Sequence, residues 1–325
     1  MSGIPRLRVA VLGGGVSTEH EVSLASARDI AAALDPHAYE VLAFTRLRDG
    51  GWHDATGRPI AAASFVARLA DADVVIPAFH GRGGEDGTVA GLLEVVGVPY
   101  VGAGPSAGAI AVDKRMTRLL ASELGIDVAP GFVVTRRDDP RLAWVEAPVV
   151  VKPVHGGSSI GVSLVHRRAE LDAAVELALR DDDGALVEAA IAGREVDVGV
   201  LELGDGTLRC APPLEIHRGT GVFDTAMKYD GEPPFTVPAE FGAARLAALQ
   251  EAAERMFRGL GCRGLARVDF FVDGDRVLLN EVNTFPGFTQ HSQFPRMFAA
   301  AGMSYAGLLE HLVRVALLQR TVAVT

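Results

Sequence analysis

Residues 265–283 read LARVDFFVDGDRVLLNEVN, two apolar segments separated by a short polar DGD turn. This pattern predicts a β-hairpin. Side chains alternate between the two faces of a strand, so Arg267 and Asp269 share one face of the first strand. Glu281 and Asn283 share one face of the second strand for the same reason. The hairpin therefore carries two polar pairs among apolar residues.

The length of the turn decides whether the two polar pairs face the same side. A three-residue turn, 273–275, would place Val272 opposite Arg276. Further along the ribbon it would place Arg267 opposite Glu281, and all four polar side chains would point to one side. A two-residue turn would put the pairs on opposite faces. We expect the three-residue turn.

Two carboxylates and an amide oxygen on one face are ligands that suit Mg²⁺, which takes few protein carboxylates and also binds substrate phosphates. Arg267 adds a positive charge that can neutralise a transferring phosphoryl group. The alternative, a solvated sheet face with ion pairs, is disfavoured by the apolar neighbours. The predicted metal ligands are Asp269, Glu281 and Asn283.

Outside the hairpin, the first hundred residues alternate strand-like and helix-like segments. LRVAVL, YEVLAFTRL, DVVIPAF and VPYVG read as strands, and a glycine loop leads into a helix after the first. This alternation predicts βαβ units and a parallel sheet, hence a Rossmann-like α/β domain over 1–102. Ligands bind beyond the carboxyl ends of such strands, where the polar loops 13–21 and 80–88 follow.

The rest of the chain predicts two further domains, 103–186 and 187–319. The first holds a helix with Lys114, the strand–turn–strand APVVVKP–HGGSSIG–GVSLV and a helix near 169–181. The second holds antiparallel strands, a helix over 240–260, the 265–283 hairpin and a closing amphipathic helix. The irregular stretch 217–238 is long for a passive connection, which favours a functional lid.

The strand before HGGSSIG ends in Lys152, a residue type that is rarely buried without a partner. The glycine- and serine-rich turn offers backbone N–H groups and hydroxyls that can cradle phosphate oxygens. The turn lacks the P-loop pattern GxxxxGK[ST], and alone it would equally fit a plain hairpin. Beside Lys152 and the carboxylate hairpin, it favours a phosphate site.

Composition excludes several other classes of protein. The net charge is −10 and no basic stripe is present, which argues against nucleic-acid binding. Cys210 and Cys262 lie far apart and predict two reduced thiols rather than a disulfide or a metal site. No apolar run is long enough to span a membrane, and the N-terminus lacks a signal peptide, so we expect a cytoplasmic protein.

Taken in order, these motifs resemble the D-alanine–D-alanine ligases of the ATP-grasp superfamily. The match covers nearly the whole chain and includes LGGGVSTEHEVSL, HGRGGEDGT, DKRMT, VVVKPVHGGSSIG, MKYD, GCRGLARVDFF and LNEVNTFPGFTQHS. HGRGGEDGT and NTFPGFTQHS are typical of this family rather than of ATP-grasp proteins generally. The resemblance implies an ATP-grasp fold, α+β overall, and a homodimer. It also implies ATP-dependent ligation of two D-alanines for peptidoglycan precursors.

The resemblance also implies how ATP and metal are bound. Lys114 and Lys152 match the lysines that hold the ATP phosphates, and Lys228 matches a contact to the γ-phosphate. Ser159 of the Gly/Ser turn belongs to the same nucleotide site. Two Mg²⁺ ions, or Mn²⁺, would be held by the three predicted ligands of the hairpin.

The nucleoside half of ATP is assigned to two glutamates. Glu188 matches the residue that reads the adenine amino group, and Glu195 matches the one that holds the ribose. The family commonly shows a lysine and a bulky residue after Glu188, whereas this chain has Ala189 and Ala190. Because adenine contacts there are partly made by the backbone, we expect the adenine site to survive.

The first D-alanine is assigned to the N-terminal loops. Glu19 matches the carboxylate that receives its ammonium group, and His80 matches a residue beside it. Ser158 and Tyr229 match the hydrogen-bonded partners of Glu19 that close two loops over the site.

The second D-alanine and the reaction itself are assigned to the C-terminal segment. Arg267 and the backbone N–H of Gly287 match the oxyanion donors, and Ser292 matches a contact to the second carboxylate. ATP would first convert the carboxylate of the first D-alanine into an acyl phosphate. The amine of the second D-alanine would then attack it through a tetrahedral oxyanion. A closing lid would keep water from the acyl phosphate.

Two departures from the family pattern lie near the second-substrate pocket. Gln290 stands where a small residue is usual, and Gln293 replaces an apolar residue. They motivate an alternative reading, a ligase whose second substrate is D-serine or D-lactate, or one serving antibiotic biosynthesis or self-resistance. The Lys228–Tyr229 pair is absent from D-alanine–D-lactate ligases, so its presence here favours an amine as the nucleophile. A non-catalytic nucleotide-binding module is disfavoured because none of the key residues is missing.

Overall fold

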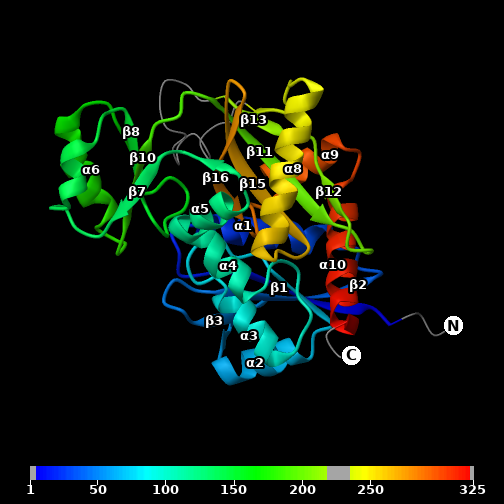
Figure 1. Cartoon of the computed structure of the whole chain (residues 1–325). Coiled ribbons are helices and arrows are strands. Elements are labelled where there is room, and N and C mark those ends of the chain that lie inside the picture. The colour runs from blue at the N-terminus through cyan, green and yellow to red at the C-terminus, as the bar shows by residue number, and fades with distance from the viewer. Residues whose placement is uncertain (1–4, 218–234, 323–325) are drawn as a thin grey trace.

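A computed structural model describes residues 5–217 and 235–322 and shows a mixed α/β architecture built on three sheets (Figure 1). The predicted Lys228 and Tyr229 lie outside the described residues. No helix in the described ranges is long and apolar enough to cross a membrane. Both cysteines are free thiols, as the sequence predicted.

The first sheet confirms the predicted parallel, Rossmann-like core. Its strand order is β4-β3-β2-β1-β5, and β1 pairs in parallel with both β2 and β5. Two short antiparallel strands at the edge, β3 and β4, were not predicted, and VPYVG contributes only one bridge, Val75 to Tyr100. The elements are β1 (Leu7–Gly14), α1 (His20–Ala33), β2 (Tyr39–Arg46), β3 (Trp52–Asp54), β4 (Pro59–Ile60), α2 (Ala62–Ala70), β5 (Val74–Pro77) and α3 (Thr88–Val96).

The second sheet is antiparallel, with strand order β7-β10-β8-β9, and stands apart at the left of Figure 1. Strands β8 and β9 flank the Gly/Ser turn, which confirms the predicted strand–turn–strand. The elements are β7 (Gly131–Val134), η1 (Pro140–Trp144), β8 (Val149–Pro153), β9 (Ser163–Val165), η2 (Arg168–Glu170), α6 (Leu171–Ala178) and β10 (Ala185–Ala189).

The third sheet has seven strands and contains the 265–283 hairpin at its centre, as β15 and β16. Helix α8 covers one face (Figure 1). The segment 105–128 also packs here, because β6 pairs with β16 and α4 and α5 join the same apolar core. The predicted domain limits at 102 and 186 stay a prediction. The elements are α4 (Pro105–Val112), α5 (Lys114–Glu123), β6 (Asp127–Val128), β11 (Arg194–Glu202), β12 (Leu208–Cys210), β13 (Leu214–Ile216), β14 (Phe235–Thr236), α8 (Ala243–Leu260), β15 (Leu265–Asp273), β16 (Arg276–Asn283), α9 (Gln293–Ala300) and α10 (Tyr305–Val322).

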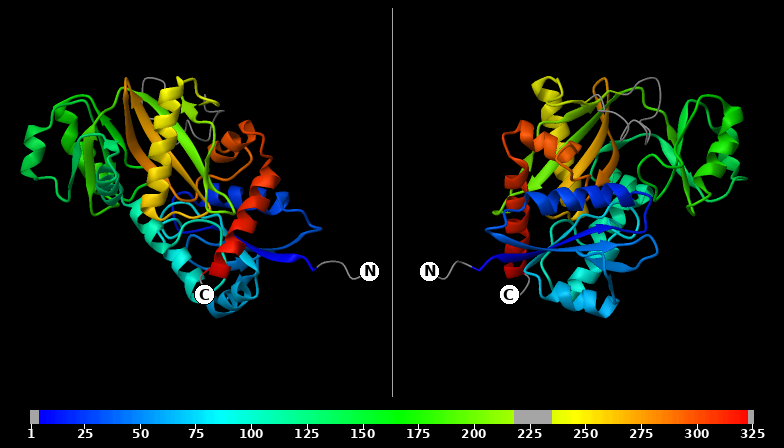
Figure 2. Two further views of the ribbon diagram at one scale, coloured as in Figure 1. Left: turned by 45° about the vertical axis from the view of Figure 1, so that its right-hand side comes forward. Right: turned by 180° about the vertical axis from the view of Figure 1, so that it is seen from behind.

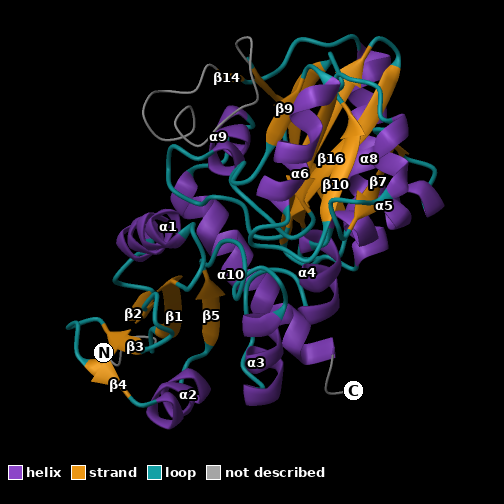
Figure 3. Cartoon of the chain, turned by 90° about the vertical axis from the view of Figure 1, so that its left-hand side faces the viewer, coloured by secondary structure: helices purple, strands orange, loops and turns teal. Residues whose placement is uncertain are grey.

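The C-terminal helix joins the first and third sheets. Helix α10 runs beside β5 and α1, and both views of Figure 2 show it against the N-terminal strands. Its apolar residues share one core with Val9 of β1, with Ile30 of α1 and with Phe294 and Phe298 of α9. In Figure 3, α1 and α10 lie on one side of the sheet and α2 on the other. The polar loops at the carboxyl ends of β1 and β5 therefore face the C-terminal segment.

Helix α4 approaches the loop that follows β5 unusually closely. A Cβ added to Gly108 would lie 2.4 Å from the backbone oxygen of Glu85 and 2.8 Å from the nitrogen of Gly87. Gly108→Ala should therefore lower the free energy of unfolding by about 1–3 kcal/mol, because backbone on both sides must move. Urea denaturation followed by circular dichroism measures this change.

Gly91 in α3 is the matched control, since a Cβ there would meet nothing within 4 Å. Gly91→Ala should raise the stability by about 0.5–1 kcal/mol through the higher helix propensity of alanine. Equal effects of the two substitutions would show that the close approach of α4 is not a packing constraint.

Candidate functional site

A cavity of about 920 Å³ lies where the three sheets meet. It is lined by loops of the first sheet, by the start of α5 and the Gly/Ser turn, and by β15, β16 and the residues after β16. The volume suits a ligand larger than a single amino acid. The predicted site residues in its wall are Glu19, His80, Lys114, Ser158, Arg267, Glu281, Asn283, Gly287, Ser292 and Gln293.

The hairpin has a different register from the one predicted. Asp273 pairs with Arg276, so the turn contains two residues and not three. A β-bulge between Asp269 and Phe270 then leaves Asn280 as an extra residue in β16. Because of this extra residue, the side chains of β16 that follow the bulge point to the opposite face from the one that the two-residue turn alone would give them.

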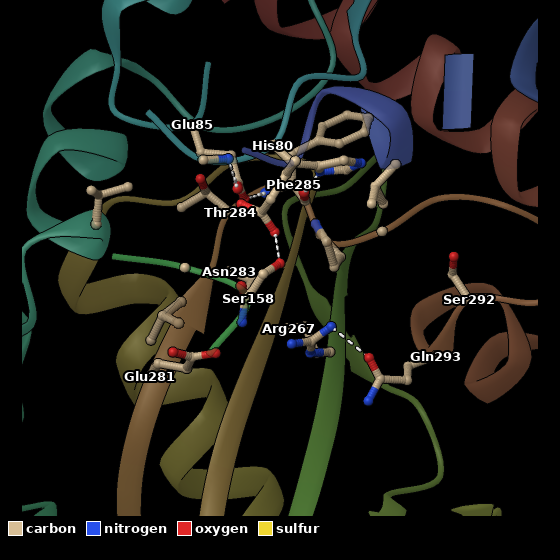
Figure 4. Close-up of a pocket in the computed structure, with 18 of the residues that line it drawn as sticks. His80, Glu85, Ser158, Arg267, Glu281, Asn283, Thr284, Phe285, Ser292 and Gln293 are labelled. Carbon is tan, nitrogen blue, oxygen red and sulfur yellow. Dashed lines mark hydrogen bonds between the residues drawn. The ribbon is translucent and has the colours of Figure 1, made fainter. Parts of the chain in front are cut away.

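Because of the bulge, the polar residues still share one face. Arg267 pairs with Asn283, and Asp269 pairs with Glu281, instead of the predicted pairing of Arg267 with Glu281. Figure 4 shows Glu281 and Asn283 on β16 with Arg267 beside them on β15. The predicted common face therefore exists, but the bulge produces it and not the turn length.

Arg267 is held by three side chains. Its Nε and Nη2 donate to the two carboxylate oxygens of Asp269, each at 2.7 Å, and Nε lies 3.5 Å from Asp197. Its Nη1 donates to Gln293 Oε1 at 2.9 Å, as Figure 4 shows. Burial alone would lower the pKa of Arg267, but Asp269 and Asp197 outweigh it and hold the pKa well above its ordinary value. The guanidinium is therefore a fixed positive charge at the cavity wall.

Both lysines predicted to bind phosphate, Lys114 and Lys152, are buried. Lys114 donates to the backbone oxygen of Gly156, and burial lowers its pKa while Glu281 opposes that shift. Lys152 lies 2.6 Å from Glu188 and donates to Asn280 Oδ1 at 3.1 Å. Lys114 thus lies close enough to Glu281 for the two charges to interact, and Lys152 contacts the bulge of the hairpin through Asn280.

Glu19 lies in a narrow space between two loops. It accepts a hydrogen bond from the hydroxyl of Ser158. A Cβ added to Gly81 would lie 2.6 Å from Glu19 and would displace its carboxylate, and the φ of +69° at this residue also favours glycine. Ser158 and Ser159 have φ of 49° and 58°, a region that costs a non-glycine residue roughly 1 kcal/mol. Such local strain is typical of loops that serve a ligand site.

The segment 285–290 exposes one backbone N–H to the cavity. The amide groups of Phe285, Phe288 and Gln290 donate to side chains of the N-terminal sheet layer, and that of Thr289 donates to Ser292 Oγ. Residue 286 is proline and has no N–H. The N–H of Gly287 has no hydrogen-bond partner among the residues that the structure describes, and Gly287 lines the cavity. It is therefore available to a ligand.

Glu85 is a cavity residue that the sequence reasoning missed. Its Oε2 accepts from the N–H of Gly81 at 2.8 Å, and its Oε1 accepts from the N–H of Phe285 at 3.1 Å. Burial in the wall, reinforced by the negative charge of Glu19, raises the pKa of Glu85 to about 8. An acidic residue in a glycine-rich loop beyond a parallel strand is the signal that could have identified it.

Several predicted residues lie outside the cavity wall. Asp269 is buried and paired with Arg267, and Glu188 is enclosed by Lys152 and Arg118, the latter at 2.8 Å. Lys152, Ser159 and Glu195 also do not line it, and Glu195 pairs with Phe271 and Ile216 within the third sheet. The cavity wall thus holds ten of the predicted site residues, but not Asp269, Lys152 or Ser159, nor the two glutamates expected at the nucleoside.

The hairpin residues fit a magnesium ion in the chemistry of their oxygen atoms. A carboxylate has about four acceptor positions. Hydrogen bonds occupy three of these acceptor positions at Asp269. Arg267 donates two of the bonds, and the amide nitrogen of Asn283 donates the third at 3.0 Å. Glu281 opens to the cavity beside it. Few protein oxygens facing open space suit an ion that completes its shell with phosphate oxygens and water.

Comparison with known proteins places these features in one family. A family model described as D-ala D-ala ligase N-terminus matches residues 8–103, and one described as D-ala D-ala ligase C-terminus matches residues 120–314. The D-alanine--D-alanine ligase of Corynebacterium aurimucosum is 42% identical over 347 residues, covering 96% of this chain and 98% of that protein.

Solved structures of similar fold include two ligases. The VanG D-Ala:D-Ser ligase from Enterococcus faecalis is 32% identical with a TM-score of 0.85, covering 96% of this chain and 100% of the other. A D-alanine--D-alanine ligase from Bacillus anthracis, complexed with ATP, is 28% identical with a TM-score of 0.82, covering 98% and 99%. These likenesses confirm the predicted ATP-grasp fold.

The raised pKa of Glu85 predicts a pH-dependent stability. The folded carboxyl keeps its proton up to about pH 8, whereas the unfolded one releases it near its ordinary value of 4.5. Between these values the folded state binds the extra proton, so this group's contribution to the free energy of unfolding falls as pH rises. The free energy of unfolding of the wild type minus that of Glu85→Gln should therefore fall between pH 5 and pH 8, by an amount on the order of 1–3 kcal/mol.

Denaturant unfolding of both proteins at several pH values measures this difference. Glu176→Gln, at an exposed glutamate of α6, is the control and should follow the wild type at every pH. A difference between wild type and Glu85→Gln that stays constant over the range would contradict the assignment.

Proposed function

The chain belongs to the D-alanine–D-alanine ligase family, and we propose that the cavity described above is where it joins two D-alanines at the expense of ATP. It is an ATP-dependent enzyme that forms D-alanyl-D-alanine, which serves peptidoglycan synthesis. The observation that carries the proposal is the meeting, in one cavity, of the Glu19 carboxylate, the Arg267 cation with the free N–H of Gly287, and Glu281 and Asn283 together with Lys114.

The first D-alanine is proposed to bind between the N-terminal loop and the Gly/Ser turn. Its ammonium group pairs with Glu19, whose orientation is set by the hydroxyl of Ser158. Tyr229 is proposed to complete this group from the segment outside the described residues. The carboxylate of the substrate then points toward Arg267, since both groups line the same cavity.

The ATP phosphates are proposed to lie between the lysines and the hairpin, near Ser159 and Lys228. Lys114 and Lys152 neutralise phosphate charge, and Mg²⁺ held by Asp269, Glu281 and Asn283 supplies further charge neutralisation for phosphoryl transfer. For the nucleoside, Glu188 is proposed to exchange one of its ion pairs for the adenine amino group, and Glu195 to hold the ribose.

The reaction is proposed to proceed in two balanced steps. A carboxylate oxygen of the first D-alanine attacks the γ-phosphorus, the bond to the bridging oxygen breaks, and ADP leaves. The amine of the second D-alanine then attacks the acyl carbon, the bond from that carbon to the phosphate oxygen breaks, and inorganic phosphate leaves with the proton of the amine as the peptide bond forms. Arg267 and the free N–H of Gly287 receive the oxyanion that develops between attack and departure.

The second D-alanine is proposed to bind next to Ser292 and Gln293, on the side of Arg267 away from Glu281 (Figure 4). Ser292 accepts from the N–H of Thr289 at 3.0 Å and contacts its hydroxyl at 2.8 Å, so its orientation is fixed. Of the two departures noted in the sequence, Gln293 lines the cavity and Gln290 does not. The choice of second substrate therefore depends on Gln293. We also propose a cytoplasmic location, which the sequence pattern favours, and a homodimer, which the family resemblance implies.

Product identification tests the proposed function. With ATP, Mg²⁺ and D-alanine, mass spectrometry should detect D-alanyl-D-alanine with one phosphate released for each dipeptide. In mixtures of D-alanine with D-serine or D-lactate near neutral pH, the D-alanine dipeptide should dominate, because an amine is the proposed nucleophile. A preference for the mixed dipeptide or the depsipeptide would assign the alternative second substrate instead.

Glu281→Gln tests the metal face. The amide is neutral and binds a divalent cation more weakly, so turnover should fall at least about 100-fold, roughly the loss expected when an essential charge is removed. Raising the Mg²⁺ concentration should restore part of the activity. Glu251→Gln, on the exposed face of α8, is the control and should keep normal turnover. Normal activity of Glu281→Gln at low Mg²⁺ would remove the metal assignment.

A further inference from the structure

His80 is buried at the junction between the N-terminal sheet and the segment 285–290, with 4% of its surface exposed. Its Nδ1 lies 3.0 Å from the backbone oxygen of Phe285, and its Nε2 lies 3.1 Å from the hydroxyl of Ser26 on α1. Both ring nitrogens are thus used by groups of the protein itself. The ring connects two parts of the chain that lie about two hundred residues apart.

These contacts fix the protonation state of His80. A carbonyl oxygen can only accept, so Nδ1 must carry a proton. Burial lowers the pKa of His80 below its ordinary value, which favours the neutral ring. In the neutral ring Nε2 is an acceptor, and it receives the hydroxyl proton of Ser26. No proton-accepting or proton-donating capacity remains for a substrate.

The hydrogen bonds of His80 belong to a closed chain. The N–H of Phe288 donates to Ser26 Oγ at 3.1 Å, Ser26 donates to His80, and His80 donates to the carbonyl of Phe285. The N–H of Phe285 is held separately by Glu85. Both ends of the tetrapeptide 285–288 are therefore fixed by the N-terminal layer, and Gly287 lies between them.

We propose that Ser26 and His80 are positioning residues that act on the reaction through the backbone of 285–288, by keeping the N–H of Gly287 directed into the cavity. The inference rests on the proposed function of Gly287 as an oxyanion donor. His80 is then neither an acid nor a base in the reaction, although it lines the cavity.

Ser26 makes the proposal testable because it does not reach the cavity. It is fully buried and absent from the cavity wall, so it cannot touch a substrate. Any effect of Ser26 on turnover must therefore pass through His80 or the amide of Phe288.

Ser23 provides a matched control on the same helix. It is also fully buried, accepts from the N–H of Gly14 at 2.9 Å and donates to the carbonyl of Ala78 at 2.6 Å. Ser23 therefore makes the same number and kind of bonds as Ser26, but within the N-terminal sheet. The two alanine substitutions remove equivalent buried hydrogen bonds, and only one of them releases the 285–288 segment.

The experiment compares Ser26→Ala with Ser23→Ala in steady-state kinetics and thermal unfolding. Both should lower Tm by a similar amount. Ser26→Ala should lower kcat roughly 10- to 100-fold, the loss expected when an oxyanion donor is displaced rather than removed. KM for ATP and for the first D-alanine should change less than about twofold. Ser23→Ala should keep kcat within about twofold of wild type.

Two substitutions of His80 separate positioning from acid–base chemistry. An asparagine amide can replace the Nδ1–H donor, whereas a glutamine amide reaches the Nε2 position. His80→Asn should therefore retain more turnover than His80→Gln or His80→Ala, and its kcat should have the same pH profile as wild type. Loss of a limb of the pH profile in His80→Asn would assign proton transfer to His80 and overturn the inference.

The remaining outcomes are equally decisive. Equal losses of kcat in Ser26→Ala and Ser23→Ala, or no loss in either, would show that the closed chain contributes only to folding. If the wild-type protein formed no dipeptide, the proposed function would fail first, which is a separate result. A wild type that is active, beside a fully active Ser26→Ala, would refute the positioning role alone.

Discussion

The buried charge of Arg267 is the constraint on which the rest of the site depends. Removing a guanidinium from water costs several kcal/mol unless ionic partners and hydrogen bonds replace the lost solvation. Asp269 supplies two bonds from the same strand, and Asp197 supplies a second negative charge from the neighbouring strand β11. Such a cluster contributes little to the net stability of the fold, but it allows only one placement of the guanidinium between its two carboxylates. Strand pairing between β11 and β15 thereby fixes the position of the cation, and the cation fixes the carboxylate proposed to hold metal.

Local patterns in the sequence were sufficient to predict these helices and strands, but not to predict which residues of paired strands lie opposite each other. Alternating apolar segments predicted the parallel N-terminal sheet and the 265–283 hairpin, because both periodicities are properties of one strand or helix. The register of the hairpin was wrong because a DGD turn accommodates two or three residues, and the bulge at Asn280 has no periodic signature. The bulge is fixed by nonlocal contacts, including Lys152 from the second sheet.

Residues that act through the backbone were also invisible in the sequence. Ser26 and Glu85 lie among residues whose pattern indicates a helix face and a glycine-rich loop, and each also accepts a hydrogen bond from an amide group more than 190 residues away. The family resemblance identified residues by motif, and the fold brings ten of them to one cavity. It did not anticipate that Glu188 would be enclosed by Lys152 and Arg118. Lys152 and Glu188 are both buried, and a buried lysine needs a partner of opposite charge.

The two kinds of contact between the N-terminal layer and the C-terminal segment have different consequences. Apolar packing of α10 against α1 and β5 sets the separation of the two parts, because close-packed side chains resist compression. It leaves the rotation of individual peptide groups undetermined, since dispersion is not directional. Side chains of Ser26, Asp29, His80 and Glu85 determine that rotation through hydrogen bonds to the backbone of 285–290. Within 285–290 the other backbone N–H groups are hydrogen-bonded, and only that of Gly287 has no partner in the part of the chain that the structure describes. The hydrogen bonds that hold the neighbouring peptide groups therefore also set the direction of the Gly287 N–H.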